Sequence, residues 1–397
     1  MKALEGIKIL DLSRILAGPY CTQVLGDLGA EIVKVEQPGT GDASRGWGPP
    51  YAEGEAAYYL SVNRNKRSLT LDLHSPEGRE IARQLARQSD VVIQNFKYGE
   101  AEKMGLGYDD LRADNPRMVY CTISGYGPKG PNKERPGFDF MMQAQTGIMS
   151  LTGPVEGPPS RVGVAVVDVT TGLYASNAIL AALFARSRHP TQQGQKVEAS
   201  LYECALAWLA NVAQNYLVSG KDPVRYGNAH PNVVPYEPFK CADGVEVAVA
   251  IATDPQYHRF CKLAGRSDLS EDPRYLKNKG RVEHREELVA TMRQVFLTRP
   301  SLEWVELLMN NNIPAGEINT ISQAFNNPHT IALEIVQEIE HPTIGKLKMV
   351  RSPMTFSETP TVIERHPPLL GEHTAEILGE LGYTPEQQAA LKTKGVV

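Results

Sequence analysis

One carboxylate stands where a strongly apolar run gives way to a long helical pattern. Residues 162–167 form that run, Asp168 ends it, and Thr170 and Thr171 open the expected helix. An aspartate in this position commonly caps a helix by accepting backbone N–H bonds, and spacing alone favours that role. The carboxylate could instead be a nucleophile, because free helix N–H groups near Gly172 could stabilise the oxyanion formed when it attacks a thioester.

Two further polar segments have types and positions suited to ligand binding. Residues 63–67 read Asn-Arg-Asn-Lys-Arg and concentrate three cations. They form either a solvated loop or a site for the phosphates of a nucleotide-bearing cofactor, since arginine suits bidentate phosphate contacts. Asn95, Phe96 and Lys97 follow a predicted parallel strand, where ligands of open α/β sheets collect, although an ordinary strand-end turn would look the same.

Several common motifs are missing from the chain. The first β-turn-α element reads DLSRILAGPY where a dinucleotide-binding fold would show GxGxxG, and no phosphate-binding GxxxxGK[ST] loop occurs. The nine histidines show no HExxH spacing, and the five cysteines never form CxxC. The pattern therefore favours a metal-free mechanism, no disulfide framework and no permanently bound cofactor.

Composition narrows the class of protein. The 397 residues are 42% hydrophobic and 22% charged, which is typical of a globular protein large enough for two or three domains. A net charge of −5 gives no global field for nucleic acid. The apolar segment 172–185 is too short to span a bilayer, and charged residues interrupt the N-terminal apolar runs. We predict a cytoplasmic protein with no nucleic-acid or membrane partner.

The elements that must position these side chains alternate between strand and helix. Short β-rich runs and helical stretches follow one another through residues 7–124, which predicts a Rossmann-like parallel sheet. Ser75 and Pro76 are typical of a helix start, so a helix is predicted over 76–88. The run 162–169 is predicted to be another strand. Asp243-Gly244 should turn an antiparallel hairpin at the start of a smaller α+β domain.

Six ordered segments resemble the family III CoA-transferases of the CaiB/BaiF type over nearly the whole chain. They read LDLSRILAGPYCTQVLGDLGAEIVKVEQPGTGD, NRNKRSLTLDL, QNFKYG, CTISGYGPKGP, RVGVAVVDVTTGLYA and PPLLGEHTAEIL. The resemblance implies an α/β chain folded as an open ring and an obligate homodimer of two interlocked rings. Its substrates would be an acyl-CoA and a carboxylic acid.

Domain boundaries follow from the element pattern together with this resemblance. Residues 1–200 and 330–397 are predicted to form a large Rossmann-like CoA-binding domain. Residues 225–315 would form the small α+β domain, and 201–224 and 316–329 would be linkers.

The resemblance also assigns residues. Asp168 matches the family's catalytic aspartate, which would form an aspartyl anhydride and then an aspartyl-CoA thioester. The other matched positions would contact CoA: Leu16, Ala17, Gln37, Leu71, Asp72, Leu73, His74, Asn95, Phe96, Lys97, Lys103, Arg135 and Phe138. Two of them depart from the family, which often has Arg in place of Gln37 and, in some members, Arg or His in place of Lys103.

Related activities remain as alternatives. An α-methylacyl-CoA racemase has a histidine where this chain has Phe138, and phenylalanine cannot move a proton. Formyl-CoA:oxalate transferases carry a glycine run that the segment RYGNAHPNVVPYEPF lacks. A nicotinamide-dependent dehydrogenase is suggested only by the strand–helix alternation. The chain looks closer to succinyl-CoA:glutarate (hydroxymethylglutarate) CoA-transferases, which implies succinyl-CoA as donor and a dicarboxylate as acceptor.

A dicarboxylate would need a second anion contact in the protein. Arg45 lies in the glycine- and proline-flanked loop 41–50, where a planar guanidinium could bind the distal carboxylate. It could equally be a solvated arginine or a CoA contact. His230, from the irregular segment between the predicted domains, is a secondary candidate for the same role.

Overall fold

The computed structural model describes all 397 residues and divides them into two compact units. Unit 1 contains residues 1–148, 162–221 and 333–397, and unit 2 contains 149–161 and 222–332. The division differs from the predicted one because most of the supposed linker 201–224 is helical, with α9 (Leu201–Trp208) burying Cys204 and Ala205 in the core of unit 1. The supposed linker 316–329 belongs to unit 2 and includes α16 (Ile321–Phe325).

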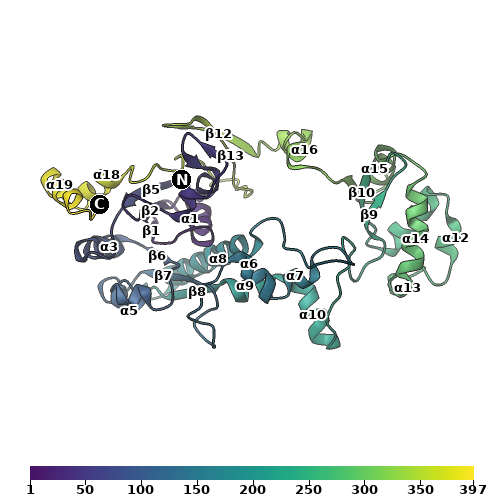
Figure 1. The fold of residues 1–397 in the computed structure, drawn as a ribbon, viewed down its shortest axis with the longest axis horizontal. Coiled ribbons are helices and arrows are strands. Elements are labelled where there is room, and N and C mark those ends of the chain that lie inside the picture. Colours follow the sequence, from purple (N-terminus) through teal and green to yellow (C-terminus); the bar gives the residue numbers. More distant parts are fainter. The chain divides into compact units, whose positions relative to one another are not determined.

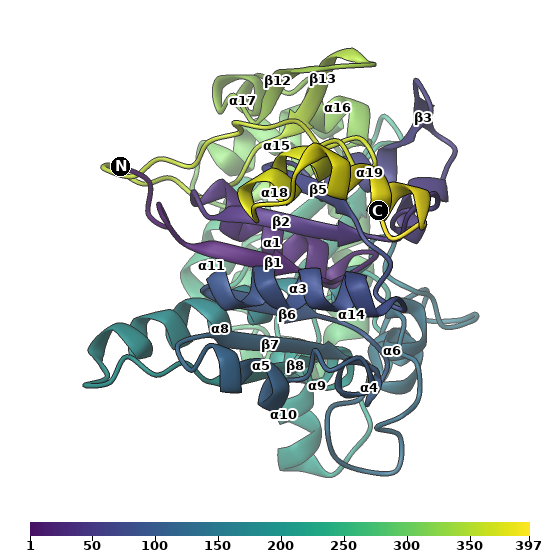
Figure 2. The ribbon, with the colours of Figure 1, turned by 90° about the vertical axis from the view of Figure 1, so that its left-hand side faces the viewer.

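Unit 1 is built on one six-stranded parallel sheet. Its strands in spatial order are β5 (Lys66–Thr70), β2 (Glu31–Glu36), β1 (Lys8–Asp11), β6 (Val91–Gln94), β7 (Val119–Ser124) and β8 (Lys196–Ser200), as Figure 2 shows. The strand order reverses between β1 and β6. In open α/β sheets this reversal leaves a crevice at the carboxyl ends of the two strands, where ligands bind. The Rossmann-like parallel sheet predicted from the sequence is confirmed.

Helices cover both faces of the sheet (Figure 1). On one face, α1 (Ala17–Asp27) and α8 (Val166–Arg188) pack with strand residues such as Ile9 and Cys121. The opposite face is covered by α3 (Pro76–Gln88), α5 (Tyr108–Asp114), α18 (Thr374–Glu380) and α19 (Pro385–Thr393). Burial on both sides explains why the strands read as continuous apolar runs.

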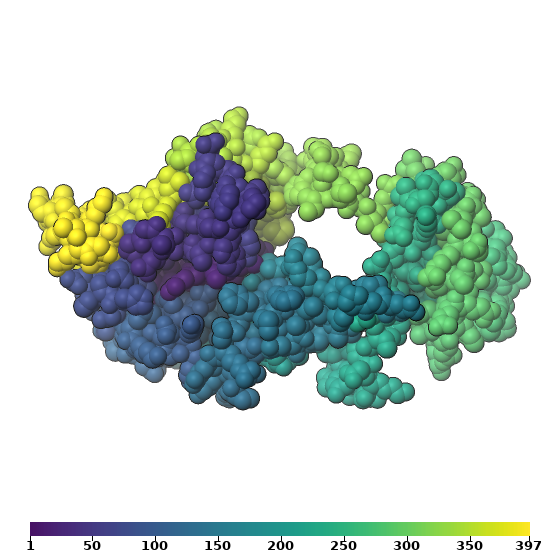
Figure 3. Space-filling model, in the orientation of Figure 1, coloured from purple at the N-terminus to yellow at the C-terminus, as the bar shows by residue number.

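The C-terminal segment returns to the N-terminal strands of unit 1. In Figure 3 these last residues, in yellow, lie beside the first residues of the chain in purple and blue. Helix α18 packs on β5, and Arg67 of that strand forms ion pairs with Glu376 and Glu380. Helix α3 starts as predicted, because the Ser75 hydroxyl accepts a hydrogen bond from the Gly78 amide and Pro76 occupies the first turn.

Unit 2 contains a three-stranded antiparallel sheet backed by helices. The strands lie in the order β11 (Ala315–Glu317), β10 (Glu246–Ala250) and β9 (Tyr236–Lys240). The predicted hairpin turn is confirmed, with Gly244 at φ +84°. Its helices are α11 (Asp254–Leu263), α12 (Ser267–Glu271), α13 (Asn278–Glu283), α14 (Arg285–Phe296), α15 (Ser301–Met309), α16 and α17 (Pro328–Ala332). In its core, the ring of Trp304 stacks on Phe260 and is tilted against Phe296.

Shorter elements complete the chain. They are η1 (Ala43–Gly46), β3 (Tyr51–Ala52), β4 (Glu55–Ala56), α2 (Ala57–Ser61), α4 (Glu100–Lys103), α6 (Asp139–Gln145), α7 (Ile148–Leu151), α10 (Ala210–Ser219), β12 (Val336–His341) and β13 (Gly345–Val350). The last two strands form an antiparallel pair.

The strand predicted over 162–169 is wrong, since α8 already begins at Val166. The sheet has no strand in this segment, and the Val167 amide donates instead to the Asp139 carboxylate of α6 at 2.8 Å. The Asp139 carboxylate therefore helps α8 to start although the first residues of α8 are β-branched, because tertiary contacts override weak helix propensities. Helix α8 is also long and apolar enough to span a membrane, but it packs on α1, α9 and strands β7 and β8.

The contact between α1 and α8 depends on Gly172. A Cβ atom at this position would lie 2.7 Å from the Ala17 carbonyl oxygen and 3.1 Å from the Tyr20 ring. We predict that Gly172→Ala lowers the free energy of unfolding by about 1–3 kcal/mol through overpacking, measured by urea denaturation. Gly379→Ala is the control, because Gly379 is an exposed helical glycine of α18 and its replacement should be neutral or slightly stabilising. Equal effects of the two substitutions would contradict this account.

Candidate active site

A pocket opens at the carboxyl ends of β1, β6 and β7, where the strand order reverses. Asp168 of α8 lines it together with the segment that follows β1 and the segment that follows β6. The residues around it include seven of the positions assigned to CoA by resemblance: Leu16, Ala17, Asn95, Phe96, Lys97, Arg135 and Phe138. The fold thus brings together, at one edge of the sheet, side chains separated by more than 150 positions in the sequence.

A second pocket contains most of the remaining candidates. Gln37, Leu71, Leu73 and His74 line it, and Arg14 and Phe96 line both pockets. Two assigned residues lie outside both linings: Asp72 accepts a hydrogen bond from the His74 amide at 2.9 Å, and Lys103 is exposed at the end of α4.

Asp168 is the third residue of α8 and does not cap it. The N-cap position is Ala165, and the Asp168 carboxylate accepts no hydrogen bond and forms no ion pair. Burial, followed by the nearby negative charge of Asp139, raises the pKa of Asp168 to about 7. The capping role favoured by spacing is therefore wrong, and an aspartate with this environment is suited to acyl chemistry near neutral pH.

The expectation that free helix amides near Gly172 could stabilise an oxyanion is also wrong. Gly172 is the seventh residue of α8, beyond the first turn in which helix amides lack partners, and its role is close packing. The start of α1 is the better-placed group of donors, because Leu16 and Ala17 line the Asp168 pocket and no side chain caps this helix. Its first amides are free to bind an oxyanion.

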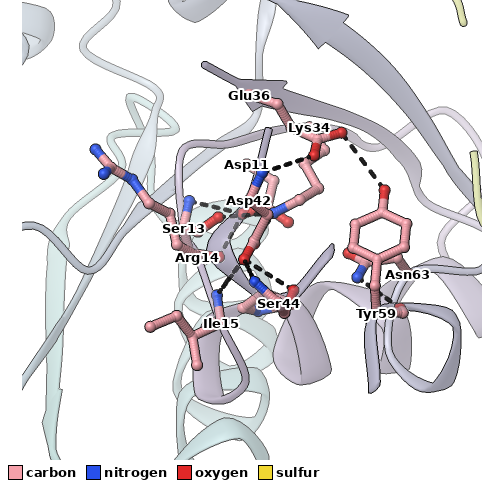
Figure 4. A network of polar contacts seen from close by, with 12 residues as sticks. Asp11, Ser13, Arg14, Ile15, Lys34, Glu36, Asp42, Ser44, Tyr59 and Asn63 are labelled. Atoms are coloured by element: carbon pink, nitrogen blue, oxygen red, sulfur yellow. Dashed lines mark hydrogen bonds and ion pairs between the residues drawn. The ribbon is translucent and has the colours of Figure 1, made fainter. Parts of the chain in front are cut away.

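The backbone of this segment is held in an unusual conformation. Ile15 has φ +74°, a left-handed value that a β-branched residue rarely adopts. Its amide donates to both carboxylate oxygens of Asp42, at 3.1 and 3.0 Å (Figure 4). On its other side, the Arg14 amide donates to Asn95 Oδ1 at 2.9 Å, and Asn95 Nδ2 donates to the Arg14 carbonyl at 2.8 Å. Strain at a binding segment persists only when surrounding contacts overdetermine it.

Those contacts belong to a buried network of charges. Lys34 Nζ lies 2.9 Å from Asp42 Oδ2 and donates to the Ser13 carbonyl at 2.9 Å, with both charged side chains fully buried. Although burial alone would raise it, the Lys34 ammonium and hydrogen bonds from Ser44 hold the pKa of Asp42 well below its usual value. Lys66 forms a second buried pair with Asp11. The network fixes the segment that carries Arg14 to Ala17.

The sequence assigned no role to three residues near Asp168: Arg14, Tyr58 and Asp139. Burial, and then the charges of Asp168 and Asp139, raise the pKa of Tyr58 to about 12. The ring of Trp47 packs edge-on against Tyr58 at 5.1 Å. Neither spacing nor periodicity distinguishes these residues, although Arg14 lies in the first of the six segments and Asp139 directly follows Phe138.

The two candidates for the distal carboxylate have other partners. The Arg45 guanidinium donates to Glu36, Glu55, the Tyr59 hydroxyl and the Pro368 carbonyl, and it lines neither pocket. In this conformation it is not available to a substrate. His230 belongs to unit 2, where its Nδ1 accepts from the Asn232 amide at 3.0 Å, and its role stays a prediction.

The cationic run 63–67 is also paired within the protein. Arg64 contacts Asp27, Lys66 is buried beside Asp11, and Arg67 binds two glutamates of α18. These cations stabilise unit 1 and do not face either pocket. No group of three or more histidine, cysteine or acidic side chains is arranged to hold a metal ion, and all five cysteines are buried and free.

Comparisons with known proteins give a consistent result. Residues 4–374 match the family model described as CoA-transferase family III. The chain is 41% identical to human succinyl-CoA:glutarate CoA-transferase, covering 100% of this chain and 90% of the relative, and 43% identical to succinate–glutarate CoA-transferase of Agrobacterium fabrum, covering 95% of each. A crystal structure of a CAIB/BAIF family protein from Brucella suis is 42% identical over 96% of this chain and 99% of that one, with a TM-score of 0.82.

The buried Asp42–Lys34 pair should control the stability of unit 1. Asp42→Asn leaves the Lys34 ammonium buried without its partner, so the free energy of unfolding should fall by about 3–5 kcal/mol in a urea titration. Glu77→Gln, which breaks the exposed pair of Glu77 with Lys394, should leave stability nearly unchanged. If both substitutions have the same small effect, the network does not hold the segment from Arg14 to Ala17 in place.

Proposed function

Because the chain belongs to CoA-transferase family III, as its sequence motifs indicated, we propose that this enzyme moves CoA from succinyl-CoA to a dicarboxylate acceptor such as glutarate, with Asp168 as the nucleophile. The observation that carries the proposal is the Asp168 carboxylate, which has no hydrogen bond or ion pair and lines the pocket where the strand order reverses. The names of the two relatives supply the substrate class, since succinate and glutarate are both dicarboxylates.

The proposed reaction conserves the energy of the thioester in two covalent intermediates. Asp168 attacks the thioester carbonyl of the donor, and the CoA thiolate leaves to give a mixed anhydride. The thiolate then attacks the aspartyl carbonyl and releases succinate, which leaves an aspartyl-CoA thioester. The acceptor carboxylate repeats the two steps in reverse, so that each step consumes one anion and releases one.

Placement of the candidates supports one extended binding mode for CoA. The thioester end would lie in the Asp168 pocket, against the amides of Leu16 and Ala17. The chain of CoA would continue past Arg14 and Phe96, which line both pockets, toward His74 in the second one. Arg14, Lys97 and Arg135 supply cations for the phosphates.

The same pocket gives no support to isomerisation. A racemase needs a group that returns a proton to the substrate, and Phe138 offers a hydrocarbon ring at the corresponding place. Asp168 is the one carboxylate in the lining of this pocket. Acyl transfer to a carboxylate needs no second acid or base, and it is the better match to these residues.

A homodimer in the cytoplasm is the proposed form of the enzyme. Large apolar side chains remain exposed on consecutive helices of unit 1, namely Leu173, Tyr174 and Phe184 on α8 and Leu206 and Trp208 on α9. An exposed apolar surface of this kind is commonly covered by a partner subunit. Interlocking of two chains is the arrangement implied by the family resemblance.

The reaction should depend on both Asp168 and an acceptor acid. Asp168→Asn should lower kcat/KM for succinyl-CoA with glutarate by at least roughly a thousandfold while CoA still binds, since the amide is not a nucleophile. Wild type should prefer glutarate over pentanoate by about tenfold or more, as a second charge-assisted contact would give. Product formation is followed by chromatography of the CoA esters.

Asp109→Asn is the matched control, because Asp109 is an exposed aspartate in the first turn of α5 and lies outside both pockets. It should retain wild-type activity. An active Asp168→Asn enzyme, or consumption of succinyl-CoA that needs no added acid, would contradict the proposed function.

The proposed assembly has its own measurement. Light scattering of the diluted protein should give about twice the chain mass of 43.6 kDa, because an interlocked pair cannot separate without partial unfolding. An active species with the mass of one chain would rule out an obligate homodimer.

A further inference from the structure

Asp139 binds the backbone next to the nucleophile. Its Oδ1 accepts the Val167 amide at 2.8 Å, and its Oδ2 accepts Gln143 Nε2 at 2.6 Å. Gln143 Oε1 in turn accepts the Val162 amide at 2.9 Å. Both side chains are buried, so α6 holds two points of the segment that leads into Asp168.

This arrangement also brings two carboxylates into one another's field. The groups that face Asp168 are Asp139 from α6, Tyr58 from α2, Arg14 after β1, Lys97 and Tyr98 after β6, and Lys133 and Arg135 after β7. None of the cations forms an ion pair with Asp168. Asp139 is the one carboxylate among these groups, and its two hydrogen bonds hold it in position.

We propose that Asp139 is a positioning residue whose charge drives Asp168 into its neutral, acylated states. The proposal rests on the nucleophilic role proposed for Asp168. Repulsion by a fixed neighbouring charge raises the free energy of the Asp168 carboxylate but not that of its anhydride or its CoA thioester, which carry no charge at this side chain. Formation of the enzyme thioester, with release of succinate, is thereby favoured.

The proposal links two measurable quantities. Protonation and acylation both convert the Asp168 carboxylate into a neutral group at the same place, so Asp139 should favour both by similar factors. The acidic limb of the pH profile reports protonation, because a protonated Asp168 cannot attack, and activity is lost as pH falls through the raised pKa of about 7. One pKa unit corresponds to a tenfold change in the equilibrium constant for acylation.

Asp139→Asn is the direct test, because the amide oxygen can still accept the Val167 amide while the charge is gone. Two quantities are compared with wild type. The first is the acidic limb of kcat/KM against pH. The second is the equilibrium between free enzyme with succinyl-CoA and enzyme thioester with succinate, read by intact-mass spectrometry at pH 8 without an acceptor. We expect the limb to move about one unit lower and the acylation constant to fall about tenfold.

Gln143→Leu separates charge from position. It removes the hydrogen bonds of Gln143 with Asp139 and Val162 but keeps the Asp139 carboxylate. It should slow the reaction without moving the acidic limb to lower pH and without the tenfold fall in the acylation constant. Should Asp139→Asn not fold, Asp139→Ser also removes the charge, keeps an oxygen on the side chain and gives the same two readouts.

The outcomes distinguish this proposal from the one on which it rests. A wild-type enzyme that never forms the thioester would overturn the role of Asp168 and this inference with it. If wild type forms the thioester but Asp139→Asn changes only the rate, or changes one of the two quantities and not the other, Asp139 serves structure alone and the inference fails while the function stands.

Discussion

The fold must tolerate one costly feature, which is a buried carboxylate without a partner. Asp168 lies in a pocket where burial and the charge of Asp139 raise its pKa to about 7, and no hydrogen bond offsets that cost. Because the pKa of this carboxyl is higher in the folded protein than in the unfolded chain, the group lowers the free energy of unfolding at neutral pH. The surrounding fold must supply the compensation, and the tight packing of α1 on α8 contributes to it.

The buried charges of unit 1 divide into two kinds with different roles. Asp11, Asp42 and Glu36 each have a cationic partner and several hydrogen bonds, and they hold the backbone beside the Asp168 pocket. Asp168 has neither, although it lies at the edge of the same sheet. Buried pairs add little net stability compared with apolar packing, but a pair that fixes a strained segment such as Ile15 defines a single geometry for the pocket.

Much of the fold could be predicted from the sequence, because the periodicity of apolar residues and the capping and turn residues act locally. The parallel sheet, the helix that starts at Pro76 and the hairpin at Gly244 all follow from such signals. The start of α8 could not be predicted, since its Val167 amide is bound by Asp139, 28 positions earlier in the chain. For the same reason Arg45 resembled a free arginine, although Glu36 and Glu55 already bind it in the folded protein.

Transfer of oxygen through Asp168 tests the central claim most directly. In the proposed reaction the acceptor carboxylate attacks the aspartyl thioester, and the thiolate later cleaves the bond between that oxygen and the acceptor acyl group. One acceptor oxygen therefore stays on the enzyme. After turnover with ¹⁸O-labelled glutarate, mass spectrometry should find the peptide containing Asp168 heavier by about 2 Da for each oxygen exchanged. An unlabelled peptide from an enzyme that has formed glutaryl-CoA would contradict a covalent role for Asp168.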